Sequence, residues 1–141
     1  MSEVLIISDN LEIAYNVDTR FSNAGWSNEN ISVLAMMGRN SASANRYQCI
    51  VLVIDIDLRK RFGSVIVEMS AIIGNFSKHS PLYIIFEGDY DSIFSVWTQY
   101  SKQSFTLTMD SAHLLNAINK IIRLESNDLP TINYCSPMDA I

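Results

Sequence analysis

Short apolar runs alternate along the chain with longer segments in which apolar residues recur every three or four positions. Two short runs, residues 4–7 and 50–54, are continuous and rich in β-branched residues, which is typical of strands covered on both faces. Three further runs predict strands at residues 31–35, 82–86 and 105–109. The alternation predicts an α/β fold, a five-stranded parallel sheet flanked by helices on both faces with flavodoxin-like topology.

Helices are predicted where the apolar residues fall on one stripe. They are residues 11–23, 64–76, 92–100 and a last helix that is capped by Asp110 or Ser111 and runs to Arg123. The stripe of the first helix comprises Leu11, Ala14, Tyr15, Val17 and Phe21. Gly25 follows this helix as its C′ residue, and Gly38 with several small residues predicts a short or irregular second helix at residues 36–46.

A chain of 141 residues fits one domain, and the 48% share of hydrophobic residues is enough for a substantial core. The apolar pattern stops after Leu124. We therefore assign residues 1–124 to the domain and residues 125–141, with Pro130 and Pro137, to a tail or linker.

The net charge of -5 and the sequence pI near 4.8 argue against direct nucleic-acid binding, which usually needs a basic surface. Cys49 and Cys135 lack the spacing of a zinc site and are expected to be free thiols. The sequence shows no basic leader and no apolar run of membrane-spanning length. We expect a cytoplasmic protein that makes no membrane contact.

Acidic residues follow three of the predicted strands: Asp9 after the first, Asp55 and Asp57 after the third, and Glu87 after the fourth. In a parallel sheet the carboxyl ends of the central strands meet at one edge, so these side chains are expected to converge. Clustered carboxylates suit a hard divalent cation such as magnesium, which neutralises a phosphoryl group arriving beside it.

Residues 4–10, VLIISDN, resemble the opening of response-regulator receiver domains, an apolar strand followed by an acidic pair. Residues 53–58, VIDIDL, are similar to the phosphoacceptor segment of that family, with Asp55 in the phosphoacceptor place, and Gly63 falls where receivers open their third helix. The resemblance covers roughly residues 4–123 in element order. It implies a receiver fold and magnesium bound by Asp9, Asp55 and the backbone carbonyl of Asp57.

The chain departs from the receiver pattern at three places. Ser8 replaces the first of the two acids, which weakens the expected magnesium binding. Glu87 stands where a switch hydroxyl is expected, and Leu107 stands where a lysine would pair with the phosphoryl group. Phe105 lies near the place of an aromatic that rotates with pocket state, although simple packing explains it as well. We expect weak or absent phosphorylation at Asp55.

The resulting hypothesis is an atypical receiver, or pseudo-receiver, that acts in signal transduction through protein contacts and is not an enzyme. Glu87 is expected to imitate an occupied pocket. The fourth helix, fifth strand and last helix are the expected surface for a homodimer, a histidine kinase or a downstream regulator.

Two alternatives stay open: a conventional receiver phosphorylated at Asp55, and a small nucleotide- or flavin-binding protein. The second lacks a glycine-rich phosphate loop after the first strand. For Asp9, an N-cap of the first helix is an equally open alternative to a metal ligand.

Overall fold

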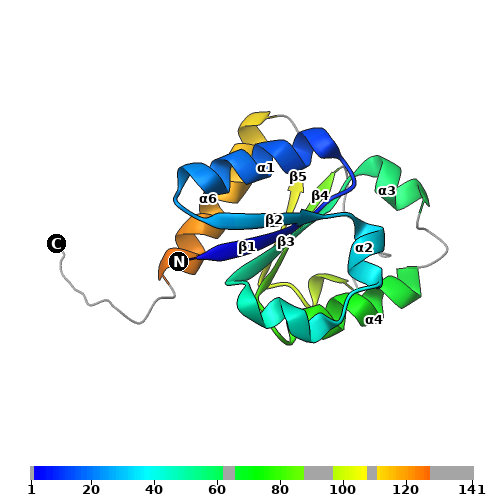
Figure 1. Ribbon diagram of the computed structural model, residues 1–141. Coiled ribbons are helices and arrows are strands. Elements are labelled where there is room, and N and C mark those ends of the chain that lie inside the picture. Colours follow the sequence, from blue (N-terminus) through cyan, green and yellow to red (C-terminus); the bar gives the residue numbers. More distant parts are fainter. Residues whose placement is uncertain (1, 62–65, 88–96, 108–110, 128–141) are drawn as a thin grey trace.

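A parallel sheet with the strand order β2-β1-β3-β4-β5 forms the centre of the computed structural model, which describes residues 2–61, 66–87, 97–107 and 111–127 (Figure 1). The strands are β1 Glu3–Ile7, β2 Ser27–Ile31, β3 Cys49–Ile54, β4 Leu82–Glu87 and β5 Gln103–Leu107. All four neighbouring pairs are parallel. This order is that of flavodoxin-like receiver folds, so the predicted fold class is confirmed.

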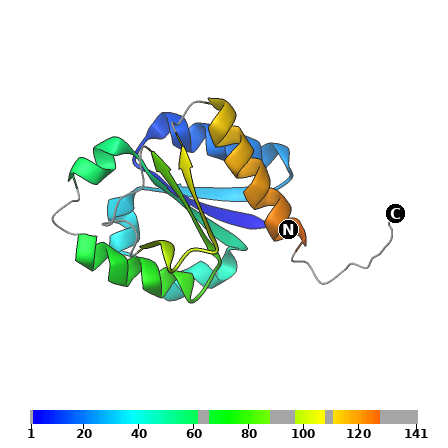
Figure 2. The same cartoon turned by 180° about the vertical axis from the view of Figure 1, so that it is seen from behind.

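The sheet is buried between two helical layers, as Figures 1 and 2 show from opposite sides. One layer consists of α1 Leu11–Asn23 and α6 Ser111–Asn127, and the other of α2 Val33–Met37, the 3-10 helix η1 Ser41–Arg46, α3 Ile56–Arg61 and α4 Ile66–Ser77. Successive side chains of a strand point to opposite layers. Leu52 therefore packs with the α4 side and Val51 with the α1 side. All six residues of β3 are buried, which explains its uninterrupted apolar sequence.

Helix α1 has the predicted bounds, and its C-terminal end has the predicted glycine. Gly25 adopts a φ of 88°, a left-handed conformation that glycine enters without a steric penalty. The N–H of Trp26 donates to the carbonyl of Phe21 at 3.0 Å, and the two rings meet edge to face with centroids 5.2 Å apart. These are the hydrogen bond and hydrophobic contact of a Schellman motif.

The outward residues of α1 differ from the prediction. Leu11 is 84% exposed and Tyr15 is 69% exposed, although both were assigned to the apolar stripe. Ile13, which was not assigned to it, is buried with Val17. The stripe is narrower than predicted because α1 packs mainly against β1, β2 and α6, which leaves Leu11 and Tyr15 on its outward face.

The second strand was predicted wrongly. Residues 31–35 were expected to form it, but β2 is Ser27–Ile31, an edge strand of four polar residues followed by Ile31. Ser32 then caps α2, with its Oγ accepting the N–H of Ala35 at 3.1 Å. The predicted irregular second helix is divided into α2 and η1, with Gly38 between them.

The helix predicted at residues 64–76 corresponds to α4 alone. Helix α3 begins at Ile56, directly after β3, and was not predicted, whereas α4 begins at Ile66. The fifth strand is Gln103–Leu107, two residues earlier than predicted. Most of the helix predicted at residues 92–100 lies outside the described residues. Its Trp97 is 1% exposed, and the indole Nε1 donates to Ser70 Oγ at 2.6 Å.

Helix α6 continues to Asn127, three residues beyond the predicted end of the domain. Glu125 is only 2% exposed, so this last turn of the helix packs against the rest of the described chain. Its carboxylate accepts hydrogen bonds from the Tyr83 hydroxyl and from Lys102 Nζ, the latter at 3.1 Å. Glu125 is polar although it is buried, so the apolar pattern of the sequence stops before the helix does. Residues 128–141 lie outside the description.

Cys49 is a buried free thiol at the start of β3, as predicted, and Cys135 lies outside the described residues. Burial raises the pKa of the Cys49 thiol well above its usual value, and the nearby Glu125 carboxylate adds to this effect. A thiol with a raised pKa is a poor nucleophile, so Cys49 has a packing role.

Candidate functional site

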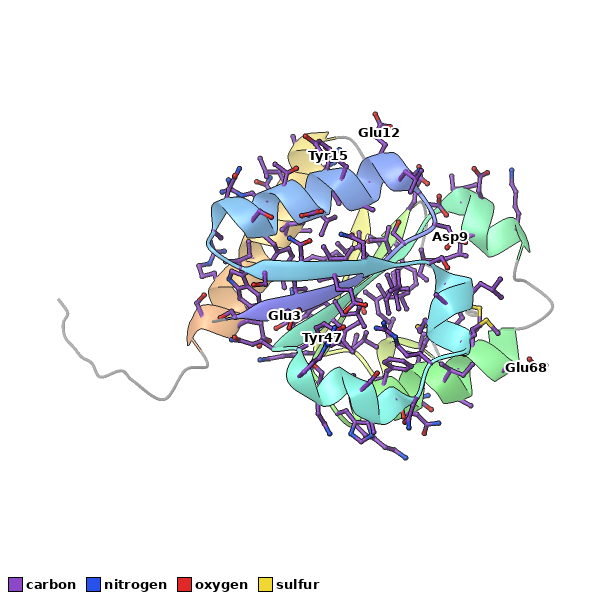
Figure 3. All side chains as sticks on the ribbon, in the orientation of Figure 1. Glu3, Asp9, Glu12, Tyr15, Tyr47 and Glu68 are labelled. Carbon is purple, nitrogen blue, oxygen red and sulfur yellow. The ribbon has the colours of Figure 1, made fainter. Side chains whose placement is uncertain are left out.

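The acidic residues at the carboxyl ends of β1, β3 and β4 lie along one edge of the sheet. Asp9 follows β1 by two residues, Asp55 is the first residue after β3, and Glu87 is the last residue of β4. The three strands are adjacent and parallel, with Ile7 opposite Leu52 and Ile54 opposite Phe86. Figure 3 shows Asp9 at this edge. The topology thus brings these residues to one region, as the strand pattern indicated.

Asp55 acts as the N-cap of α3. The residue is 6% exposed, and its Oδ1 accepts the N–H of Leu58 at 2.9 Å. A carboxylate in this position satisfies one of the free amides of the first helical turn and interacts favourably with the helix dipole. This contact explains why the chain turns into a helix at Ile56, without an intervening loop.

Glu87 reaches from β4 to the same helix end. Its Oε1 accepts the N–H of Ile56 at 3.0 Å, so two carboxylates from neighbouring strands bind amides in the first turn of α3. The direction of the Glu87 side chain was not readable from the sequence. The structure places the Glu87 carboxylate beside Ile56, the residue that directly follows Asp55, where it accepts the backbone N–H.

Asp9 binds the start of α2, and Asn10 binds the start of α1. Asp9 Oδ1 accepts the N–H of Val33 at 2.8 Å, and Asn10 Oδ1 accepts the N–H of Ile13 at 3.0 Å. The N-cap of α1 is therefore Asn10, and the hypothesis that Asp9 caps this helix is wrong. Ser8, in the place of the first receiver acid, is buried, and its hydroxyl exchanges hydrogen bonds with the backbone of Asn10.

The structure shows where each of the three expected magnesium ligands lies. Asp57 is exposed in the first turn of α3, where backbone carbonyls point along the helix and away from the strand end. Asp9 and Asp55 each accept a backbone N–H, as described above. Within residues 2–61, 66–87, 97–107 and 111–127, no three histidine, cysteine or acidic side chains come together as a metal site.

The predicted switch positions lie on β4 and β5. Leu107 is the register partner of Glu87, and the side chain of Leu107 is not among those that the structure describes. The sequence contains no lysine or arginine between Lys102 and Lys120, so β5 brings no cation to the edge that holds Asp55. Phe105 is half-buried and packs against the core cluster that includes Leu114 and Ile118 of α6. Its position fits a packing role, and the switch role stays a prediction.

An ion-pair cluster that the sequence did not indicate fixes the irregular segment after α2 to the edge strand. Glu29 of β2 binds Arg39 at 2.7 Å and also contacts Arg46 and the Tyr47 hydroxyl. The Tyr47 hydrogen bond and the two arginines lower the pKa of Glu29 from 4.5 to about 2. The sequence signal for this cluster is one acidic residue, Glu29, followed by two arginines, and this pattern does not specify which of them form ion pairs.

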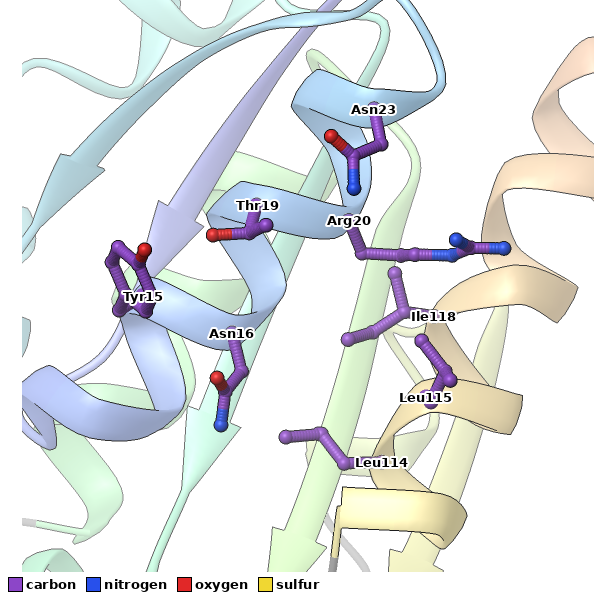
Figure 4. A pocket seen from close by; sticks show the side chains of 8 residues that line it. All are labelled: Tyr15, Asn16, Thr19, Arg20, Asn23, Leu114, Leu115 and Ile118. Atoms are coloured by element: carbon purple, nitrogen blue, oxygen red, sulfur yellow. The ribbon is translucent and has the colours of Figure 1, made fainter.

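Two depressions flank α1. One, of about 250 Å³, lies between α1 and α6, and Figure 4 shows Arg20 extending across it from α1 toward α6. Arg20 Nε donates to Asn119 Oδ1 at 2.5 Å, so the two helices are tied together there. The other, of about 450 Å³, lies at the edge of the sheet beside Asp9. Only the second depression belongs to the candidate site.

Comparison with known proteins identifies the fold. No family model and no curated protein sequence matches the chain. A CheY-like response regulator from Mesorhizobium loti superposes with a TM-score of 0.62 at 14% identity over 84% of this chain and 97% of its own. The chain has the fold of a response-regulator receiver domain.

Two more receivers support this assignment. A response regulator from Hahella chejuensis has a TM-score of 0.60 at 17% identity, covering 96% of this chain and 99% of its own. A CheY-like receiver domain protein from Methanospirillum hungatei JF-1 has a TM-score of 0.60 at 12% identity, covering 92% and 99%. The predicted receiver resemblance is confirmed at the level of fold. Separately, no helix in the described part of the chain is long and apolar enough to cross a bilayer.

Proposed function

We propose that this chain is an atypical receiver domain that acts in signal transduction through protein contacts, with weak or absent phosphorylation of Asp55. The observation that supports this proposal is the hydrogen bond from the Ile56 N–H to Glu87. A phosphoryl group on Asp55 would need donors close to the end of β3, and backbone amides at a helix start are typical phosphate donors. In this chain a carboxylate of β4 already accepts from the first of these amides.

Electrostatics favour the same conclusion. A phosphoryl group adds about 1.5 to 2 negative charges at neutral pH. Glu87 contributes a carboxylate to the same helix end, and β5 supplies no lysine there to compensate. Like charges in one site oppose each other, so phosphorylation would be disfavoured. The arrangement supports a pocket that is held in a single state by its own carboxylates.

The function that follows is regulatory and not catalytic, and it does not depend on magnesium. Asp55 caps α3, and Asp9 accepts the N–H of Val33 at the start of α2, which gives both residues a role without metal. A histidine kinase or a downstream regulator would act as a protein partner, and self-association through the β5 and α6 side is part of the proposal. Partner binding, in place of phosphorylation, would then determine the signalling state.

Intact-mass measurement after incubation with acetyl phosphate and magnesium tests the proposal. We expect no phosphoryl gain in the native chain and the same result for Asp55→Asn. A triple variant, Ser8→Asp with Glu87→Thr and Leu107→Lys, restores the receiver pattern, and we expect it to gain a phosphoryl group. Adding Asp55→Asn to this variant should abolish the gain.

A phosphoryl gain in the native chain that Asp55→Asn removes would support the conventional receiver instead. Flavin absorbance or a nucleotide released from the purified protein on denaturation would support the ligand-binding alternative. The restored variant shows that the assay detects phosphorylation in this fold, so a negative result for the native chain is informative.

A further inference from the structure

The groove between α1 and α6 combines an apolar lining with a positive charge. Its volume is about 250 Å³, and Leu114 and Ile118 of α6 are the buried part of its lining. Arg20 extends across it from α1 (Figure 4), and its Nε donates to Asn119 Oδ1 of α6 at 2.5 Å. This hydrogen bond holds the guanidinium in place but uses only the Nε–H. The N–H groups of the two Nη atoms are left for other acceptors.

No carboxylate neutralises Arg20 within the described part of the chain, where its side chain has the Asn119 hydrogen bond alone. Helical ion pairs form between residues three or four positions apart. On α1 these positions are uncharged: they are Asn16, Val17, Asn23 and Ala24. A half-buried arginine that is fixed in orientation and lacks a counter-charge is suited to binding an anion.

Exposed apolar side chains of both helices extend the groove at its rim. Tyr15 of α1 is 69% exposed and Leu115 of α6 is 41% exposed, and both line the groove. Removing apolar side chains from water is favourable in proportion to the area that is covered. Asn16 and Thr19, which are exposed on the α1 wall, offer hydrogen-bonding groups to a bound chain. The groove therefore offers charged, polar and apolar contacts together.

The charge of the groove determines the chemistry of its partner. A carboxylate accepts paired hydrogen bonds from a guanidinium, and such charge-assisted bonds are stronger than neutral ones. The chain has a net charge of -5, but charges farther away than about 8 Å are largely screened at physiological salt, so the local cation dominates. A small carboxylate beside Arg20 would leave Tyr15 and Leu115 in water. A protein segment with an acidic residue next to an apolar one covers all three side chains.

A second copy of the chain is a poorer occupant of this groove. Permanent homodimer interfaces are large and apolar, whereas transient signalling contacts lie at the low end of the size range, below about 1,200 Å² in total. The groove offers the exposed Tyr15 and Leu115 beside the cation of Arg20. Its size and polarity fit the transient class, and therefore a separate partner protein.

We propose that the groove between α1 and α6 binds a segment of a partner protein that carries an aspartate or glutamate next to an apolar residue. The carboxylate binds Arg20, and the apolar residue packs on Tyr15 and Leu115. This inference rests on the proposed function, in which protein contacts carry the signal, and it names the chemistry by which one partner is recognised.

The test uses the full chain labelled with nitrogen-15 and a blocked serine-leucine-glutamate-leucine-serine peptide. A peptide in which glutamine replaces glutamate has nearly the same shape without the charge. We expect the glutamate peptide to shift the Arg20 Nε–H resonance and the backbone amides of Thr19 and Leu115 with millimolar affinity. The glutamine peptide should bind at least fivefold more weakly. Raising sodium chloride from about 25 to about 300 mM should reduce this preference, because salt screens an accessible ion pair.

Four variants complete the design. Arg20→Gln should make the two peptides equal, and Arg20→Lys should keep part of the preference, because lysine retains the charge without the forked donors. Leu115→Ser should weaken both peptides while leaving the preference for glutamate. Lys78→Gln removes a positive charge from an exposed residue that follows α4, and it should change neither affinity.

Equal binding of the two peptides by the native chain would overturn the inference. An unchanged preference in Arg20→Gln would do the same, since another cation would then bind the peptide. If sodium acetate shifts the Arg20 Nε–H resonance at the same concentration as the glutamate peptide, the groove is a general anion site and the inference fails.

Two measurements identify the competing protein occupants. If Asp128→Asn with Asp139→Asn raises the affinity for the glutamate peptide, the C-terminal residues of the chain itself occupy the groove, and a partner segment does not. Glu12, two turns before Arg20 on α1, is the exposed acid that a second copy would supply. A native dimer that both Glu12→Gln and Arg20→Gln convert to a monomer in sedimentation would therefore assign the groove to a second copy.

The phosphorylation assay is independent of these measurements. A phosphoryl gain at Asp55 in the native chain refutes the proposed function but leaves a measured glutamate preference at Arg20 unchanged. Loss of that preference refutes the assignment of the groove and leaves the phosphorylation result as it stands.

Discussion

Replacing Glu29 by glutamine should destabilise the domain in a pH-dependent way. The pKa of this carboxyl falls from 4.5 to about 2 in the folded chain, with the Tyr47 hydroxyl as the largest cause and Arg39 next. A fall of this size corresponds to roughly 3 kcal/mol of stability. Glu29 is 28% exposed and Arg46 is 59% exposed, so solvent screening reduces the expected loss to about 1 to 2 kcal/mol.

The sign follows from linkage. A carboxyl with a depressed folded pKa contributes its full stabilisation above its unfolded pKa, near pH 4.5, and loses it as the pH falls toward 2. Urea unfolding of the native chain and Glu29→Gln should therefore differ most above pH 5.5 and converge toward pH 2. Glu12→Gln, an exposed acid on α1, is the matched control and should stay within about 0.5 kcal/mol of the native chain. A Glu29→Gln difference that is independent of pH would refute the reasoning.

Two other substitutions test the fold. Tyr83→Phe removes the hydroxyl that donates to the buried Glu125 carboxylate and should lower the unfolding free energy by about 1 to 3 kcal/mol; an unchanged urea midpoint would contradict this contact. Gly25→Ala places a side chain at a φ of 88° and should cost about 1 to 2 kcal/mol in the same measurement, although no atom lies within 4 Å of the added Cβ. A neutral result would show that the helix end relaxes.

The sequence predicted the arrangement of acids better than their contacts. Asp9, Asp55 and Glu87 lie at one sheet edge because a parallel sheet places all carboxyl strand ends together, and the apolar runs were sufficient to identify these strands. The directions of these side chains could not be predicted in the same way, because they depend on which backbone amides lie nearby. The bond from Ile56 to Glu87 required knowing that α3 starts immediately after Asp55.

The errors have related physical causes. Strand β2 was misplaced because an edge strand covered on only part of its surface has no need for apolar residues, as its sequence SNENI shows. Helix α3 was missed because Ile56 and Leu58 continue the apolar run of β3. The end of α6 was misplaced because the buried residue that completes it is Glu125, whose burial depends on partners far away in the sequence.

The last turn of α6 has a practical consequence for measuring how this domain moves. Glu125 joins the turn to Tyr83 on β4 and Lys102 before β5, and its backbone carbonyl accepts from Gln48 before β3. A spectroscopic label placed on Ser126 would therefore report rotation of the whole helix against three strands. Distances from such a label to one on α4 would follow rearrangement of the domain without contributions from fraying at the helix end.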